Sequence, residues 1–118
     1  MAQLRLTLVL NSGARIGPGK AALLKSVHSC GSISAAAREM GMDYKRAWHL
    51  IDSLNQAFKT PAVERTTGGT GGGGAALTPF GEELLARYQK LEATARELAA
   101  SDLKALERNS SGKAGPKV

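Results

Sequence analysis

The chain has 118 residues, the size of one small domain with at most a short appended element. Sixteen Lys and Arg residues against ten Asp and Glu give a net charge of +6 and a pI near 9.8. Aromatic residues make up only 4%, and the Leu- and Ala-rich apolar content favours helices around a modest core. The chain holds no apolar run of the roughly 18 residues that a membrane span requires, and its start shows no secretory signal pattern. We therefore expect a cytoplasmic protein with no membrane partner.

Metal and catalytic chemistry find little support. Cys30 is the only cysteine, which excludes an intramolecular disulfide and a cysteine-based metal site. His28 and His49 lie too far apart for a short ligand motif, and no nucleophile–base or paired-carboxylate spacing stands out. We expect no enzyme, no metal and no cofactor.

The basic surplus is concentrated in residues 1–78, which hold nine basic and four acidic side chains. Residues 79–108 hold five basic and six acidic side chains. A basic domain of this size is typical of nucleic-acid binding, because each phosphate that it neutralises releases condensed counterions. Many small proteins are basic for other reasons, so the charge alone does not decide the function.

The first half of the chain predicts one strand and three helices. Leucines alternate with other residues over 3–10, which predicts a half-buried strand. A proline in its first turn and a glycine after its end bound a helix over 18–30. Two further helices, 32–40 and 44–58, follow capping residues and are joined by a tight turn at Gly41. Helix, glycine turn and helix are the organisation of a helix-turn-helix.

The second half predicts a hairpin and a long helix. AVERTT and AALT read as two strands joined by a reversal with six glycines. A helix then runs from Pro79 to about residue 107, some 40 Å at about 1.5 Å per residue, too long for the preceding core to cover. We expect a mainly α fold with a small β-hairpin: a winged helix-turn-helix domain over 1–78, a long dimerisation helix over 79–108 and a disordered basic tail over 109–118.

The helix over 44–58 divides into an apolar and a polar face. Successive residues of a helix are rotated by about 100°, so each side chain has a defined direction around the helix axis. The apolar side chains fall within an arc of roughly 100°, and the polar and aromatic side chains fall within a separate arc of roughly 140°. The apolar group is Ala47, Leu50, Ile51, Leu54 and Phe58, and the polar and aromatic group is Tyr44, Lys45, Trp48, His49 and Asp52. An exposed face with donors and apolar surface is what a recognition helix needs to contact phosphates, base edges and thymine methyls.

A second interpretation of these side chains stays open. Tyr44 and Trp48 can equally be half-buried packing residues. Lys45 and Arg46 would then lie on a solvated flank.

Three stretches carry a family resemblance: GSISAAAREMGMDYKRAW over 31–48, VERTTGGTGGGGAALT over 63–78, and the PFG that follows. Together they resemble the N-terminal DNA-binding domain of the ModE family of molybdate-responsive regulators, a relative of the LysR-type winged helix-turn-helix. The similarity extends over nearly the whole chain, and the glycine-rich wing is its most specific part. The resemblance implies a dimer on an operator of molybdenum-uptake genes. It also implies molybdate sensing by C-terminal modules; the sequence ends where these would begin, so we expect no direct molybdate binding.

The resemblance also implies roles for individual residues. The helix over 44–58 would enter the major groove, the helix before it would cross the backbone, and the wing would reach an adjacent groove. The DNA-binding candidates are Tyr44, Lys45, Trp48 and His49 towards the bases, Ser34, Arg38 and Arg46 towards phosphates, and Arg65, Thr66, Thr67 and Thr70 in the wing. The alternative interpretation of the glycine-rich segment is a surface loop that contacts nothing. It is not a phosphate-binding P-loop, since no Gly-Lys-Ser/Thr follows.

The long helix carries an apolar stripe at alternating spacings of four and three, which indicates a partner helix. The predicted dimer contacts are Leu84, Tyr88, Leu91, Ala95 and Leu98. A symmetric homodimer, with help from the first strand, would place two recognition helices about 34 Å apart on half-sites one helical turn apart. The alternative is an intramolecular helix with a frayed end.

The sequence therefore predicts a sequence-specific transcriptional regulator that binds double-stranded DNA as a homodimer on a palindromic operator. The second hypothesis is a winged-helix protein-interaction module that pairs with a separate effector-binding subunit and does not read DNA. RNA is a less suitable partner, because the sequence offers no aromatic platform for single strands.

Overall fold

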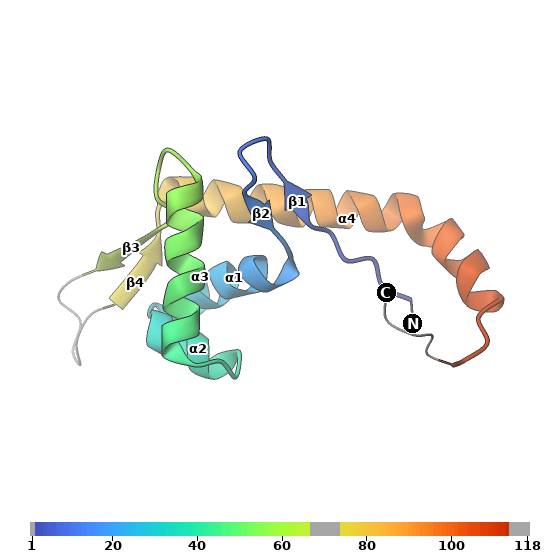
Figure 1. Cartoon of the computed structure of the whole chain (residues 1–118), viewed down its shortest axis with the longest axis horizontal. Helices are drawn as coiled ribbons and strands as arrows, with labels where there is room; N and C mark the ends of the chain where they lie inside the picture. Colours follow the sequence, from blue (N-terminus) through green and yellow to red (C-terminus); the bar gives the residue numbers. More distant parts are fainter. Residues whose placement is uncertain (1, 67–73, 114–118) are drawn as a thin grey trace.

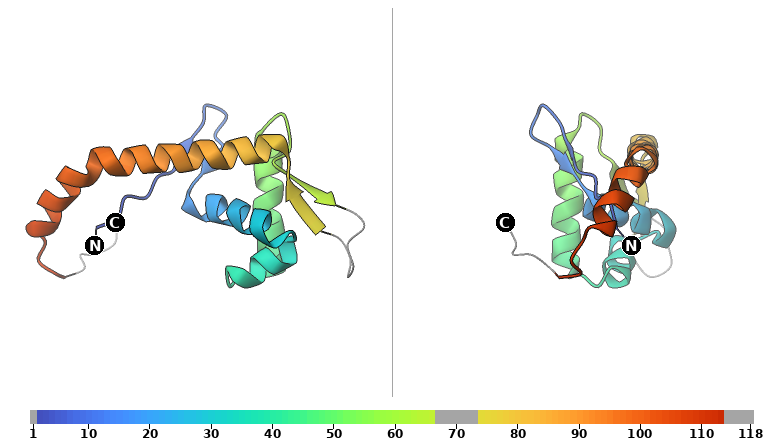
Figure 2. Two further views of the ribbon diagram at one scale, coloured as in Figure 1. Left: turned by 180° about the vertical axis from the view of Figure 1, so that it is seen from behind. Right: turned by 90° about the vertical axis from the view of Figure 1, so that its right-hand side faces the viewer.

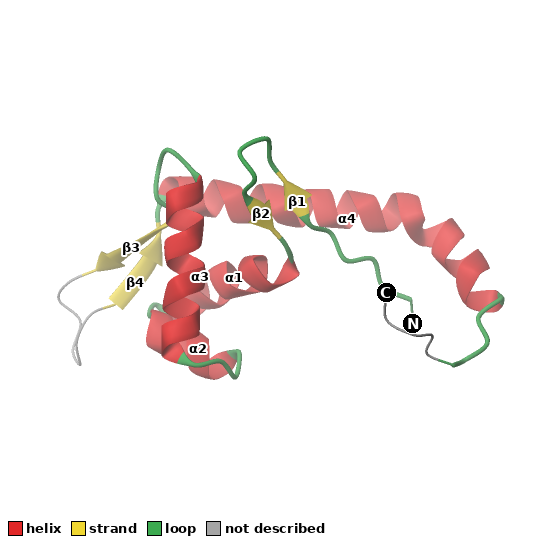
Figure 3. Ribbon diagram, in the orientation of Figure 1, coloured by secondary structure: helices red, strands yellow, loops and turns green. Residues whose placement is uncertain are grey.

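The computed structural model describes residues 2–66 and 74–113. The elements in chain order are β1 (Leu8–Val9), β2 (Arg15–Ile16), α1 (Pro18–Cys30), α2 (Ile33–Glu39), α3 (Tyr44–Ala57), β3 (Val63–Thr66), β4 (Gly74–Leu77) and α4 (Pro79–Arg108) (Figure 1). The architecture is mostly helical with a small hairpin formed by β3 and β4 (Figure 3). The predicted fold class, a winged helix-turn-helix followed by a long helix, is confirmed.

The helices begin where the sequence supplies capping side chains. The side-chain oxygens of Ser32, Asp43 and Thr78 accept backbone N–H groups at the starts of α2, α3 and α4, at 2.9, 3.2 and 3.0 Å. Each bond satisfies a donor that a helix start leaves without a partner. At the end of α1, Gly31 takes a left-handed φ of 73° and donates its N–H to the Val27 carbonyl at 2.9 Å. Local chemistry therefore sets these boundaries to within one residue of the prediction.

The predicted strand over 3–10 is wrong in its length. Only Leu8 and Val9 form a strand, which pairs antiparallel with β2, an element that the sequence did not predict. The leucine alternation is real, because Leu4 and Leu6 are half-buried while Arg5 is exposed. The segment before β1 nevertheless has no neighbouring strand in the described chain, and it packs as an extended segment beside α4.

Tyr88 joins this N-terminal segment to α4. Its hydroxyl donates a 2.6 Å hydrogen bond to the carbonyl of Leu6, 82 residues earlier in the chain. Burial raises the pKa of Tyr88, and the nearby Glu92 adds to the effect. The hydroxyl therefore stays protonated and keeps its role as a donor.

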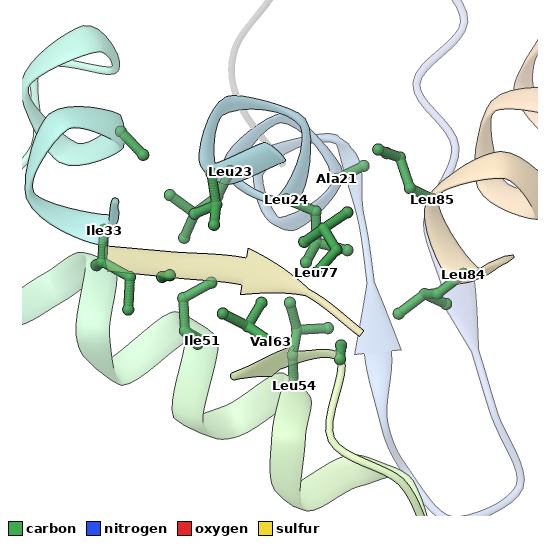
Figure 4. Packing of buried hydrophobic residues seen from close by; sticks show 14 of the residues in the cluster. Ala21, Leu23, Leu24, Ile33, Ile51, Leu54, Val63, Leu77, Leu84 and Leu85 are labelled. Carbon is green, nitrogen blue, oxygen red and sulfur yellow. The ribbon is translucent and has the colours of Figure 1, made fainter. Parts of the chain in front are cut away.

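The hydrophobic core lies where α1, α2, α3, the hairpin and the start of α4 meet (Figure 4). Its largest fully buried side chains are Ile16, Leu23, Leu24, Val27, Ile51 and Leu54. The α4 helix contributes Leu84, Leu85 and Tyr88 and has no buried residue beyond that point. The wing and the C-terminal part of α4 therefore extend from the core towards opposite ends of the molecule (Figure 2).

The contact between α4 and the base of the wing is too close for a side chain. A Cβ atom on Gly81 would overlap the carbonyl oxygen of Ala62, which itself accepts the N–H of Thr78 at 3.0 Å. The Thr78 hydroxyl also donates to the Pro61 carbonyl at 2.6 Å. Gly81 thus lets the first turn of α4 lie directly on the segment that leads into β3.

We expect Gly81→Ala to lower the free energy of unfolding by about 1–3 kcal/mol, because the added methyl must push α4 away from the wing base. Urea unfolding followed by circular dichroism measures the change. Gly19→Ala is the matched control, since a Cβ there meets nothing within 4 Å and the residue lies in the first turn of α1. Equal stability of the two variants would contradict the close packing.

Candidate nucleic-acid interface

The helix-turn-helix consists of α2, a short turn and α3. Gly41 in the turn adopts a φ of 65°, which favours glycine, and the N–H of Met42 returns to the Ala37 carbonyl at 2.9 Å. Ala47, Ile51 and Leu54 are buried on the inner face of α3. Because this face is buried, the opposite face of α3 points outwards, as the rotation of successive residues along the helix predicted.

The outward face of α3 carries polar and basic side chains. Tyr44 is 47% exposed, and Lys45, Arg46 and His49 are exposed as well. Lys45, Arg46 and His49 line a shallow depression of about 310 Å³ together with Asp43 and Leu50. The structure therefore brings these basic candidates together near the N-terminal end of α3.

The two candidates in α2 lie on its exposed side. Ser34 and Arg38 are separated by one helical turn, so they share a face, whereas Ile33, Ala36 and Ala37 are buried. Their exposure leaves both side chains available for a contact with a large ligand.

The wing begins with a regular antiparallel pair. Val63 lies opposite Leu77 and Thr66 opposite Gly74, and the hairpin is tied to the end of α1 by a 2.9 Å bond from the Ala75 N–H to the Gly31 carbonyl. The candidates Arg65 and Thr66 are exposed. Thr67 and Thr70 lie outside the described residues.

Trp48 occupies a different place from the other candidates. It is half-buried and packs against the hydrophobic core, and the guanidinium carbon of Arg65 lies 4.7 Å from the centre of its ring. This distance is typical of a cation–π contact. The structure thus joins Trp48 to the core and to the wing.

Asn55 is a contributor that the sequence reasoning missed. Its side-chain oxygen accepts the N–H groups of Ala62 and Val63 at 2.8 and 3.0 Å, and its amide donates to the Val63 carbonyl at 3.0 Å. These three bonds hold the start of β3 against the C-terminal half of α3. The one available signal was its position seven residues after Trp48, on the same side of the helix.

The predicted dimer contacts fall into two groups. Leu84 and Tyr88 are 8% and 2% exposed and belong to the core of the single chain. Leu91 and Leu98 are 47% and 79% exposed, and Ala95 is half-buried. Only the part of the stripe beyond Tyr88 is therefore accessible to a partner.

The lone cysteine takes part in a polar link between α1 and α2. The Ser26 hydroxyl donates to Glu39 at 2.7 Å, and the thiol of Cys30 lies 3.5 Å from the other oxygen of the same carboxylate. His28 is exposed on α1. Across residues 2–66 and 74–113, no group of three potential ligands is placed to hold a metal ion, and no helix has the length and apolar character to cross a membrane.

Comparison with known proteins identifies the same helix-turn-helix. Residues 20–82, more than half of the chain and the segment from α1 into the first turn of α4, match the model of the bacterial regulatory helix-turn-helix proteins of the lysR family. The molybdenum-pterin-binding protein MopB of Rhodobacter capsulatus is 46% identical over 95 residues, which are 80% of this chain and 35% of MopB.

Two regulators named ModE are similar over a comparable share of the chain. That of Haemophilus influenzae is 41% identical over 92 residues, 78% of this chain and 36% of the relative. The DNA-binding transcriptional dual regulator ModE of Escherichia coli K12 is 43% identical over 90 residues, 76% and 34% of the two chains. The chain thus spans about a third of the length of these curated relatives. With its matched segment folded as helix-turn-helix and wing, the chain belongs to the lysR family of bacterial regulatory helix-turn-helix proteins.

Proposed function

We propose that this chain is a sequence-specific DNA-binding transcriptional regulator that acts in the cytoplasm as a homodimer on a palindromic operator. The observation that carries the proposal is the outward face of α3, where Tyr44, Lys45, Arg46 and His49 are all exposed. Family membership supports the same function.

In this proposal α3 lies in the major groove, which is wide enough to admit a helix. Lys45, His49 and Tyr44 would contact base edges. Arg46 would contact phosphates, together with Ser34 and Arg38 from α2. The basic charge of these elements supplies the salt-dependent part of the affinity, and the base contacts supply the specificity.

We propose that the regulated genes are related to molybdenum. The support is the similarity to MopB, whose name describes molybdenum-pterin binding. In this proposal the ligand of the chain is DNA, and we propose no binding of molybdate itself.

The proposed homodimer uses the apolar stripe of α4 beyond the core. Leu91 and Leu98 would pack against α4 of a second copy, with Ala95 between them. Leu84 and Tyr88 would support this interface from the chain's own core. The N-terminal segment and the C-terminal half of α4 also line a groove of about 600 Å³, whose lining includes Leu4 and Leu103. A partner could use this groove to extend the interface.

The second candidate is a protein-interaction module that pairs through α4 with an effector-binding subunit. The exposed Leu98 and Leu106 favour it equally, because they would fit any helical partner. The two functions differ at α3, whose polar face has no role in the second.

Fluorescence anisotropy against a pool of short duplexes, including an imperfect palindrome, tests DNA reading. Lys45→Ala is expected to weaken binding by roughly tenfold, and His49→Ala to relax the preference among duplexes, since one base contact contributes about 1–3 kcal/mol. The series is run at several salt concentrations, with and without molybdate. Lys90→Ala is the control, because it also removes an exposed positive charge, but from α4, outside the helix-turn-helix. Weak binding that is blind to sequence and insensitive to Lys45→Ala would favour the interaction module.

Leu98→Asp is expected to convert the dimer to a monomer, because dimerisation would bury an uncompensated carboxylate. Size-exclusion chromatography with light scattering should show a dissociation constant raised at least about tenfold, which corresponds to about 1.4 kcal/mol. Ala93→Asp adds the same charge off the stripe and should leave the dimer intact. A wild-type chain that elutes as a monomer would refute the dimer.

A further inference from the structure

Two side chains distant in the sequence form the one cation–π contact recorded among the described residues. Trp48 comes from the middle of α3 and Arg65 from β3, and the guanidinium carbon lies 4.7 Å from the ring centre. Trp48 also packs against the core. The indole therefore lies between the core and an exposed arginine of the wing.

A stacked arginine keeps its ability to bind an anion. Its planar face contacts the aromatic ring, while its N–H groups point outwards in the guanidinium plane and stay free to donate to phosphate oxygens. The ion pairs of the described residues, Glu83 with Arg87 and Glu92 with Arg96, both lie in α4. No carboxylate of the described chain therefore neutralises Arg65.

The contact of Trp48 with Arg65 is the second of two interactions that join α3 to β3. Asn55 holds the backbone at Ala62 and Val63, and β3 then runs towards Arg65. Trp48 precedes Asn55 by two helical turns, about 10 Å along the helix axis, on the same side. Arg65 follows Val63 by two positions, so both lie on one face of the strand. The interactions of Asn55 and Trp48 lie at different positions along the axis of α3. Together they fix the direction of β3 relative to α3.

We propose that Trp48 is a positioning residue for the wing: it holds the Arg65 guanidinium in place for a DNA phosphate, so that α3 and the wing bind the duplex as one preorganised unit. This inference rests on the proposed DNA-binding function. It assigns Trp48 a role different from the base contact expected from the sequence, because the ring is occupied by the core and by Arg65. Arg65 is the residue that touches DNA, and Trp48 acts through it.

The pair can be tested first without DNA. Trp48 is the only tryptophan of the chain, so the fluorescence reports the surroundings of this one side chain, which include Arg65. Arg65→Gln removes the cation above the ring and should shift or intensify the emission. Arg87→Gln removes an exposed arginine of α4 and should leave the emission unchanged. An emission that ignores Arg65→Gln would overturn the pair, whatever the protein binds.

The salt dependence of DNA binding then tests the positioning role. Arg65→Gln should weaken binding about two- to fivefold. It should also reduce the magnitude of the negative slope of log affinity against log salt by about 0.9 for each protomer, which corresponds to one lost phosphate contact. Trp48→Leu removes no charge, yet it should reduce the magnitude of the slope by the same amount. The double variant should be no weaker than the weaker single variant, because both changes remove one contact.

Trp48→Phe separates positioning from stability. It keeps an aromatic face for Arg65, so it should retain the wild-type slope even if it lowers the melting temperature. Trp48→Leu with an unchanged slope, or additive losses in the double variant, would overturn the positioning role while DNA binding stands. Absence of specific binding by the wild-type chain would instead refute the proposed function, and the inference with it, even where the emission test succeeds.

Discussion

The burial of one face of α3 is the constraint on which the rest of the molecule depends. Ala47, Ile51 and Leu54 are fully enclosed by α1, α2 and the hairpin, and Ala47 is small enough to let α2 approach closely. Rotation of α3 would expose these side chains and bury the basic ones without partners, both at a cost in free energy. The orientation of the polar face is thus fixed by the packing on the opposite side of the same helix.

The wing depends on the same helix through polar bonds. Asn55 forms hydrogen bonds with the start of β3, and the Gly31 carbonyl accepts a hydrogen bond from β4. The Thr78 hydroxyl accepts the Gly81 N–H at the junction with α4. Most of these bonds end on backbone groups, so they position the strands without occupying the outward side chains. The wing can therefore vary its exposed residues while its base keeps one geometry relative to α3.

The sequence predicted the helices well, because capping residues such as Ser32 and Asp43 act on the neighbouring three residues. It mispredicted the first strand, because alternation shows which side chains face inwards but cannot show whether a second strand lies alongside. The exposed DNA-binding candidates on α3 could be predicted from the helical spacing of its apolar residues. Asn55 and the contact of Trp48 with Arg65 did not, since they join residues whose proximity only the packed hairpin creates.

The part of α4 beyond Tyr88 makes few stabilising contacts within the single chain. Beyond Tyr88 the helix continues for twenty residues with no fully buried side chain, although Ala95 and Leu103 are half-buried. An ion pair joins the exposed Arg96 to the half-buried Glu92. An ion pair at the surface contributes little, and most of the stability of a helix in a protein comes from the packing of its apolar face. Burying a leucine fully contributes about 1.5–3 kcal/mol, so Leu91 and Leu98 packed against a second copy would add to the stability of this part of α4. This gain is the physical reason for proposing the dimer, with an intramolecular helix that has a frayed end as the alternative. The same contact would fix the separation of two α3 helices, so the stability of α4 and the spacing of the two half-sites would have a common origin.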